Sequence, residues 1–407
     1  MSRCVPQACL ILVIAACATC GRADDRDDPD AAVSWTGTVD TLPGGAVHVL
    51  NPAGGIWTEE DRWRLTEELR IGAVDGAGPE LWERVGGVAV DGGGRLWVTD
   101  VAASQVRVFD NAGRHVRTVG RAGGGPGEFR SPHHIWITPA QEVWVVDPDA
   151  RRLEVFDTAG SRLHGVALGG HPESVTAEQQ YVWTNDGLLY QTITRAAPGP
   201  TRNRLAVVRH RWEAGTLTPL DTFRVPNVGP PPRYTTMIEL PRGPAMAIIA
   251  IPFAHAPRRT LGPDGTVWIS EGDGAYRIRR QNVSGDTLRI IERAVEPIPV
   301  PDSVRARMRE GLPGDGDAPE IPDVIAPFET FHPSPDGTLW VRRRTGPRTY
   351  VLDVFDAAGR YQGEAVTDVN LGRFSVQLVT PDALYGTMRD DLGVQYVVAV
   401  RIERPDP

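Results

Sequence analysis

An all-β fold is predicted for this chain by a pattern of short strands that recurs along it. Trp97 and Trp144 stand 47 residues apart, and so do Phe109 and Phe156, each within a run of β-branched and aromatic residues. Gly, Asp, Asn and Pro bound these runs, as expected of strands joined by tight turns. Two landmarks with one period indicate a repeated four-stranded antiparallel unit. Such units cannot bury both faces alone, so they stack radially and close into a ring, a β-propeller.

Further copies are identified by the predicted second strand of the unit, which carries Trp97 in the first copy. It recurs at Trp183, Trp268 and Trp340 and, in degenerate form, at Tyr385. The pattern predicts a six-bladed propeller, although the weaker copies leave five or seven blades open. The predicted blades span residues 86–130, 131–170, 171–226, 248–299, 324–370 and 371–404.

The last predicted blade has room for only three strands before the chain ends. We expect residues 63–71 to supply the fourth strand, so that one blade is built from both ends of the chain. A ring closed in this way has no open sheet edge. The prediction is therefore a single propeller domain over residues 34–407.

Two segments interrupt the repeat. Residues 226–247 are rich in proline and are predicted to be irregular. Residues 301–312 are predicted to form a short inserted helix, because Asp302 or Ser303 can cap its start and Gly311 can end it. We expect this helix to pack on the propeller edge, with a lid or a partner contact as the alternative.

The connection between the first two blades resembles a known family signature. Residues 124–129, Gly-Gly-Pro-Gly-Glu-Phe, followed by Ser-Pro and a strand, are similar to the motif of NHL repeats. The resemblance covers roughly residues 63–404 and is sharp across 86–165. His133 and His134 stand where that family usually has a small residue. The resemblance implies a propeller, a fold that hosts many unrelated functions.

The N-terminus resembles the export signal of a bacterial lipoprotein. Its apolar run is far shorter than the roughly 20 residues of a membrane-spanning helix. The run ends in Ile-Ala-Ala-Cys17, which is similar to a lipobox, where the cysteine thiol receives a diacylglycerol. We predict a signal peptide over residues 1–17 with lipidation at Cys17, Cys20 being the second candidate. A cleaved signal peptide without lipid is the alternative. Residues 18–33 are predicted to form a flexible acidic tether.

Cysteine usage and net charge narrow the compartment and the partners of the protein. All four cysteines lie in the first twenty residues, as expected of a protein that works in an oxidising compartment. The formal net charge of -9 predicts no nucleic-acid partner. We therefore expect the protein in the cell envelope, at the periplasmic face or the outer membrane, where it contacts the membrane only through its lipid anchor.

One rim of the ring is predicted to carry acidic residues. In four blades an acidic residue stands three positions after the tryptophan: Asp100, Asp147, Asp186 and Glu271. In the fifth blade Arg343 interrupts the series. Four carboxylates on one rim could bind calcium or a basic partner. The alternative, which we favour, is that each carboxylate accepts backbone N–H groups in its own turn.

The mouth of the central channel is reached by counting ten residues back from the same tryptophans. The residues at these positions are Gly87, His134, Glu173, Arg258 and Thr330. Histidine, glutamate and arginine around one pore suit a small polar ligand, anionic or sugar-like. The alternative is that they only line a water-filled channel.

Two enzyme families with six-bladed propellers offer a metal-dependent alternative. Gluconolactonase-like proteins bind a divalent metal through a Glu in the first strand of an early blade, where this chain has Gly86 and Gly87. Peptidyl-hydroxyglycine lyases, which carry NHL repeats, use three His around zinc. The histidines available for such a site are His133, His134, His255 and His332.

The functional prediction is a binding module for an envelope protein or a small polar ligand. The alternative is a channel-centred hydrolase or lyase that uses His134, Glu173 and a divalent metal, calcium or zinc. No catalytic residue is assigned, because no complete catalytic motif is present in the sequence.

Overall fold

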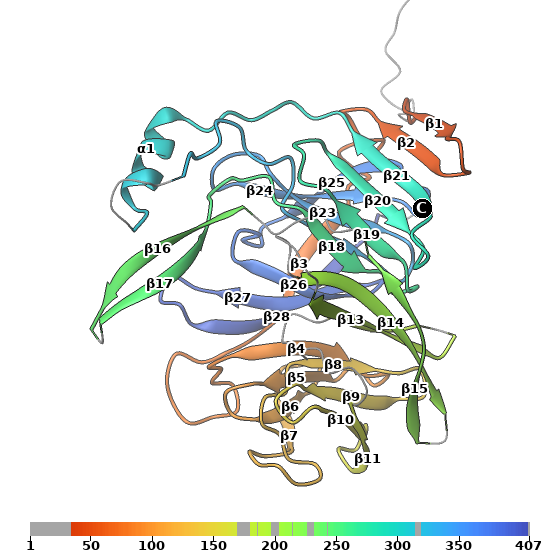
Figure 1. Cartoon of the computed structure of the whole chain (residues 1–407), viewed down its shortest axis with the longest axis vertical. Coiled ribbons are helices and arrows are strands. Elements are labelled where there is room, and N and C mark those ends of the chain that lie inside the picture. The colour runs from red at the N-terminus through yellow and green to blue at the C-terminus, as the bar shows by residue number, and fades with distance from the viewer. Residues whose placement is uncertain are drawn as a thin grey trace, which may run out of the picture.

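The structure is a computed structural model, and strands dominate it (Figure 1). The predicted signal peptide, Cys17, Cys20 and the tether lie outside the residues that it describes. In the described part, the single helix is α1 (Asp302–Glu310), within the predicted residues 301–312 and ended by Gly311 as expected. The predicted cap was wrong: Pro301 occupies the N-cap position, and Asp302 and Ser303 already lie in the first turn, where no side chain caps the helix. No helix of the described residues is long and apolar enough to span a membrane. The residues described are 34–168, 180–184, 186–196, 203–213, 215–225, 232–241, 243–313 and 319–405.

The first two predicted units are four-stranded antiparallel sheets in which sequence neighbours pair. Trp97 and Trp144 lie fully buried in their second strands, so the 47-residue repeat marks equivalent positions. The strands of the first sheet are β4 (Val85–Val90), β5 (Leu96–Asp100), β6 (Gln105–Phe109) and β7 (His115–Val119). Those of the second are β8 (His134–Ile137), β9 (Glu142–Asp147), β10 (Arg152–Asp157) and β11 (Arg162–Ala167).

The third unit corrects the predicted register. Its strands are β12 (Tyr181–Trp183), β13 (Leu188–Ala196), β14 (Asn203–Glu213) and β15 (Thr216–Arg224). The strand of Trp183 was expected to be second, but β12 is the first strand of this sheet. Tyr190 in β13 takes the buried place that tryptophan has elsewhere. The prediction was wrong because Trp183 mimics that tryptophan in sequence, whereas its ring packs 5.2 Å from Trp144 of the preceding unit.

The fourth and fifth units have the same antiparallel order. Two N-terminal strands, β1 (Thr38–Thr41) and β2 (Val47–Asn51), extend the fourth sheet, where β2 runs parallel to β21. The fourth unit consists of β18 (Arg258–Leu261), β19 (Val267–Ser270), β20 (Arg277–Gln281) and β21 (Thr287–Arg293). The fifth consists of β22 (Thr330–Pro333), β23 (Leu339–Arg344), β24 (Tyr350–Phe355) and β25 (Tyr361–Thr367).

The segment predicted to be irregular contains a β-hairpin instead. Strands β16 (Arg233–Leu240) and β17 (Gly243–Ala250) pair with each other in an unbroken antiparallel register. Figure 1 shows this hairpin projecting beside the other sheets. The prediction was wrong because the prolines of 226–232 masked the alternation of exposed and half-buried residues that follows them.

The sixth unit is built from both ends of the described chain. Strands β26 (Phe374–Val379), β27 (Ala383–Arg389) and β28 (Gln395–Glu403) are followed in the sheet by β3 (Arg64–Ile71). Strand β3 pairs antiparallel with β28, as predicted for residues 63–71. It also pairs briefly, in parallel, with β25 and so joins the fifth and sixth units into one sheet.

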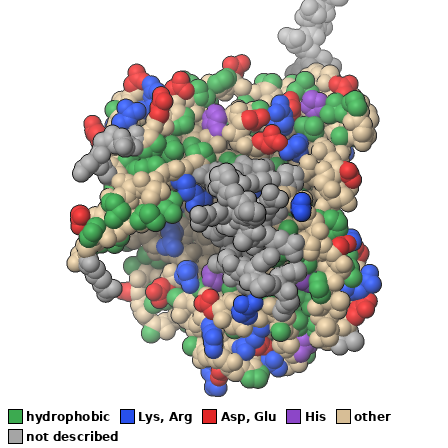
Figure 2. All heavy atoms as spheres, in the orientation of Figure 1, with side chains coloured by type: hydrophobic (Ala, Val, Ile, Leu, Met, Phe, Trp, Pro, Cys, Tyr) green, Lys and Arg blue, Asp and Glu red, His purple; other side chains and the backbone are tan. Residues whose placement is uncertain are grey.

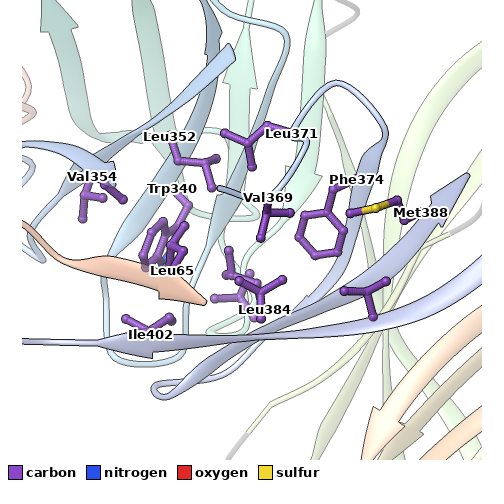
Figure 3. Close-up of a cluster of buried hydrophobic side chains, with 14 residues drawn as sticks. Leu65, Trp340, Leu352, Val354, Val369, Leu371, Phe374, Leu384, Met388 and Ile402 are labelled. Atoms are coloured by element: carbon purple, nitrogen blue, oxygen red, sulfur yellow. The ribbon is translucent and has the colours of Figure 1, made fainter. Parts of the chain in front are cut away.

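The hydrophobic core is divided among the interfaces between neighbouring units. Figure 3 shows the largest cluster, in which side chains of the fifth and sixth units point toward one another. Trp340 of β23 and Leu65 of β3 are each 1% exposed in this cluster. First strands of several units also contact one another, β4 with β8 and with β26, and β22 with β26, as expected of strands around a central channel.

Candidate functional site

The carboxylates of Asp100 and Asp147 are buried and engaged by nearby groups. Asp147 accepts hydrogen bonds from the backbone nitrogens of Arg130 (2.7 Å) and Ser131 (3.1 Å). Asp100 accepts the backbone N–H of Ala103 at 3.1 Å, and its Oδ2 lies 2.7 Å from an Arg107 nitrogen. Both carboxylates thus stabilise turns and present no free oxygen pair to a ligand.

The other predicted rim residues do not join them. Asp186 lies in the turn between the first and second strands of its unit, β12 and β13. Asp100 lies in the turn between the second and third strands, β5 and β6, which is at the other end of a unit. The shifted register of the third unit accounts for this difference. Glu271 is exposed and pairs with Arg279 at 2.5 Å. Arg343 forms ion pairs with Asp353 and Glu364. The expected acidic rim is therefore not formed by these residues.

The channel positions are equivalent in the structure, with one correction. We call the tryptophan of each second strand, such as Trp144, the marker residue of its unit. His134, Arg258 and Thr330 each pair with the residue two positions after the marker residue of their unit. In the third unit that place belongs to Gln180, whose carbonyl accepts the N–H of Thr192 at 2.9 Å. The predicted Glu173 lies seven residues earlier, outside the described residues.

A cavity of about 330 Å³ lies among the first strands of five units. Gly87 and His134, two of the predicted residues, line it. Arg258 and Thr330, the other two described residues predicted for the channel mouth, do not line it. The remaining residues around the cavity are Gly86, Val88, Ile135, Trp136, Gln180, Tyr181, Val182, Thr260, Leu261 and Gln377.

Aromatic rings form one wall of this channel cavity. Trp136 and Tyr181 are stacked, with ring centres 6.0 Å apart and planes inclined by 10°. The ring of His134 lies 5.7 Å from that of Tyr181. Burial raises the pKa of the Tyr181 hydroxyl well above its usual value, so the phenol is neutral at physiological pH.

Amide and hydroxyl groups form the polar part of the channel cavity. Gln180 donates from Nε2 to Thr260 Oγ1 at 3.3 Å, and its Oε1 accepts the backbone N–H of Leu261 at 3.0 Å. Gln191 donates to the Tyr181 hydroxyl at 3.3 Å. These bonds fix the amide and the phenol in place and connect the third unit to the fourth. The sequence could have identified Gln180, because it stands ten residues before Tyr190, the residue that takes the place of the tryptophan in this unit.

Arg258 is directed away from the channel cavity. Its Nε donates to the carbonyl of Glu329 in the next unit at 2.7 Å. Burial lowers the pKa of its guanidinium, and the neighbouring Arg342 lowers it further. Arg258 therefore lines a second cavity, next to the hairpin, instead of the channel mouth.

The histidines considered for zinc do not converge. In the described part of the chain, no three His, Cys, Asp or Glu side chains are placed to hold a metal ion. The rings of His133 and His134 have centres 6.4 Å apart. His332 pairs with Trp340 inside the fifth unit, and His255 lies beside Gly274 in the fourth.

The imidazole of His332 predicts a pH dependence of stability. Desolvation, and then the charge of Arg342, lower its pKa to about 4. Between pH 6.5 and 4 the unfolded chain therefore binds a proton that the folded chain does not. We expect the free energy of unfolding to fall over this range, by at most about 3 kcal/mol. Urea unfolding at pH 7 and pH 4.5 measures the difference.

A His332→Gln variant is expected to reduce that pH dependence, and the matched variant His115→Gln to keep it. His115 lies on an outer strand, where its ring shares a hydrogen bond with Thr118 and packs edge-on against Phe109, with ring centres 5.6 Å apart. Equal pH profiles for the wild type and His332→Gln would contradict the assignment.

One protein family matches part of the chain. A family model described as a 6-bladed β-propeller, DUF5128, matches residues 81–191. The match covers less than half of the chain, so it supports the fold without placing the whole chain in that family. Among curated proteins, none matches the sequence.

Solved structures resemble the chain only distantly. A Bacteroides fragilis protein described as a candidate exported protein has a TM-score of 0.46 at 12% identity, over 88% of this chain and 100% of that one. A Xanthomonas campestris gluconolactonase has 0.40 at 15% identity, over 86% and 95%. A calcium-binding regucalcin of Agrobacterium tumefaciens has 0.37 at 14% identity, over 87% and 96%. These low scores carry no argument about function. The family match and the repeated four-stranded sheets together identify the fold as a β-propeller.

Proposed function

We propose that this chain is an exported, lipid-anchored propeller of six four-stranded blades whose central channel binds a small uncharged polar ligand. The six antiparallel four-strand units, with β3 completing the last, support the blade count. The lipobox-like motif at Cys17 supports the anchor and the location in the cell envelope.

The observation that carries the binding role is the composition of the channel cavity. Trp136 and Tyr181 offer a stacked aromatic wall, and Gln180, Thr260 and Gln377 offer amide and hydroxyl groups beside it. Ligand pockets combine apolar and aromatic walls with a few oriented polar groups in this way.

The same cavity favours a neutral ligand over an anion. No carboxylate or guanidinium group belongs to the described residues that line it. A sugar or another polyol matches amide and hydroxyl partners and can lie against aromatic rings. An anion would find no counter-charge there, since Arg258 is directed to Glu329.

Titration with glucose, trehalose, N-acetylglucosamine and myo-inositol tests the proposal. We expect at least one of them to change the tryptophan fluorescence of residues 34–407 and to give a measurable heat of binding. Gln180→Ala and Trp136→Ala should each weaken that binding about tenfold, through a lost hydrogen bond or a lost stacking surface.

The matched control for Gln180→Ala is Gln362→Ala, because the Gln362 amide lies at the surface and bonds only to the Arg360 carbonyl. It should bind like the wild type. No binding of any of the four compounds at millimolar concentration would contradict the proposal. Near-stoichiometric zinc or calcium, retained after dialysis and lost in His134→Ala, would instead support the hydrolase or lyase.

A further inference from the structure

A second cavity, of about 470 Å³, lies where the β16–β17 hairpin meets the fourth and fifth units. Ligand pockets of about 300–1,000 Å³ typically have mostly apolar walls and a few charged or polar groups. This cavity fits that description, with Arg233, Arg258, Arg344 and Glu329 as its charged lining. Its main apolar residues are Ile248, Ile251, Phe253, Ile325 and Phe328.

Positive charge is in excess at one end of this hairpin cavity. Glu329 is the single carboxylate among the described lining residues, and it pairs with Arg344 and, at 3.1 Å, with Arg342. Arg258 bonds only to the Glu329 carbonyl, through Nε. Its two terminal nitrogens have no partner in the described structure. The Glu329 carboxylate is thus shared among three guanidinium groups, since its charge acts on Arg258 as well as on Arg342 and Arg344. Partial burial of cations with too little counter-charge is unfavourable.

The apolar wall continues to the surface of the hairpin. Ile248, which lines the cavity, is 58% exposed, and the paired residues Met237 and Met246 beyond it are 58% and 67% exposed. Figure 2 shows hydrophobic side chains gathered along this hairpin. A ligand that fills the cavity can therefore extend an apolar chain along the hairpin.

Phe253 supports a binding role for the cavity. Its φ of 59° is in the left-handed region, which a bulky aromatic residue rarely adopts. The side chain is nevertheless buried, and the guanidinium of Arg344 lies 5.2 Å from its ring centre. Such backbone conformations persist where surrounding structure holds them, and they concentrate at ligand-binding sites.

We propose that the hairpin cavity binds an amphipathic carboxylic acid. Its carboxylate would receive the two terminal N–H groups of Arg258, because the planar guanidinium matches a carboxylate in two parallel hydrogen bonds. Its apolar chain would lie against Phe253, Phe328 and Ile248. This site is separate from the channel cavity and does not depend on the function proposed for the channel.

Octanoate and 1-octanol are the probes that separate charge from apolar contact. By calorimetry on residues 34–407, octanoate is expected to bind at least tenfold more tightly than 1-octanol. In Arg258→Met the affinity for octanoate should fall about 10- to 100-fold, since a charge-assisted hydrogen bond is lost. The affinity for 1-octanol should stay unchanged.

The matched control is Arg259→Met. Arg259 is the next residue of β18, is exposed, and does not line the cavity. It should bind octanoate like the wild type. Ala250→Trp is a second variant, at an exposed lining position, and should block both probes by filling the apolar space without changing Arg258.

A short apolar peptide, tested with a free and with an amidated C-terminus, identifies the source of the carboxylate. Tighter binding of octanoate than of the free-acid peptide indicates a fatty acid, and the reverse indicates a peptide C-terminus. Either result supports carboxylate recognition if Arg258→Met weakens the binding of the preferred acid. Equal affinity of octanoate and 1-octanol, unchanged octanoate affinity in Arg258→Met, or no binding of either acid would overturn the proposal.

Discussion

Replacing Asp353 by alanine is expected to lower the free energy of unfolding by about 3–5 kcal/mol. Asp353 is fully buried between the fourth and fifth units. Its Oδ2 lies 2.7 Å from an Arg293 nitrogen and 2.9 Å from an Arg343 nitrogen. The Tyr276 hydroxyl donates to the same carboxylate at 2.8 Å. The variant would leave the buried guanidinium of Arg293 without its counter-charge and Arg343 with Glu364 alone, and this accounts for the large loss.

The network around Asp353 also positions aromatic groups. The guanidinium of Arg293 lies 3.6 Å from the ring centre of Tyr361, whose hydroxyl donates to Asp353 Oδ1 at 3.3 Å. Burial, and then the charge of Asp353, raise the pKa of Tyr276 far above its ordinary value. Loss of the carboxylate therefore disturbs the packing of the interface as well as its charge.

Urea unfolding of Asp353→Ala beside Glu403→Ala measures this effect. Glu403 pairs with Arg401 at the surface, where both side chains are well exposed. Its loss should cost less than about 1 kcal/mol. A similar, small loss in both variants would show that the buried network does not hold the two units together.

The sequence contained enough information for most of the fold, because hydrophobic strands at a fixed period determine which residues face the core. Trp97, Trp144, Trp268 and Trp340 all mark second strands. Trp183 does not mark a second strand. It lies on a first strand, and its ring packs against Trp144 of the preceding unit, in the interface between the two units. A short apolar run does not reveal its order in a sheet, so the register of the third unit could not be predicted.

The candidate site was predictable only in part. Equivalent positions in the repeat led to Gly87 and His134, which do line the channel cavity. Arg258 occupies an equivalent backbone position, but its long side chain reaches Glu329, and side-chain direction cannot be counted from a repeat. The buried pairs of Asp353 were missed because charged residues in strands are ordinarily expected at the surface. A signal was present in Arg342-Arg343-Arg344, three arginines that directly follow a fully buried strand segment.

A chain that begins at residue 73, and so lacks β3, is expected not to form the folded monomer. Strand β3 covers the edge of β28 from Val397 to Glu403. Its Leu65 (1% exposed) packs between the fifth and sixth units, and its Ile71 (2% exposed) packs between the sixth unit and the first. Removal opens both interfaces and exposes a sheet edge that can pair with other chains. Thermal unfolding followed by circular dichroism, together with size-exclusion chromatography, measures the outcome.

A chain that begins at residue 54 is the control that separates closure from the mere loss of strands. It lacks β1 and β2, which only extend the outer edge of the fourth sheet. It also loses Asn51, whose side chain bonds the backbone of Gly359 and Tyr361. We therefore expect a lower melting temperature but a cooperative transition. A peptide of residues 62–73, added to the chain that begins at residue 73, should restore folding, because it supplies strand β3 to pair with β28. A cooperative transition without β3, at a melting temperature close to that of the control, would show that the ring does not need this strand to close.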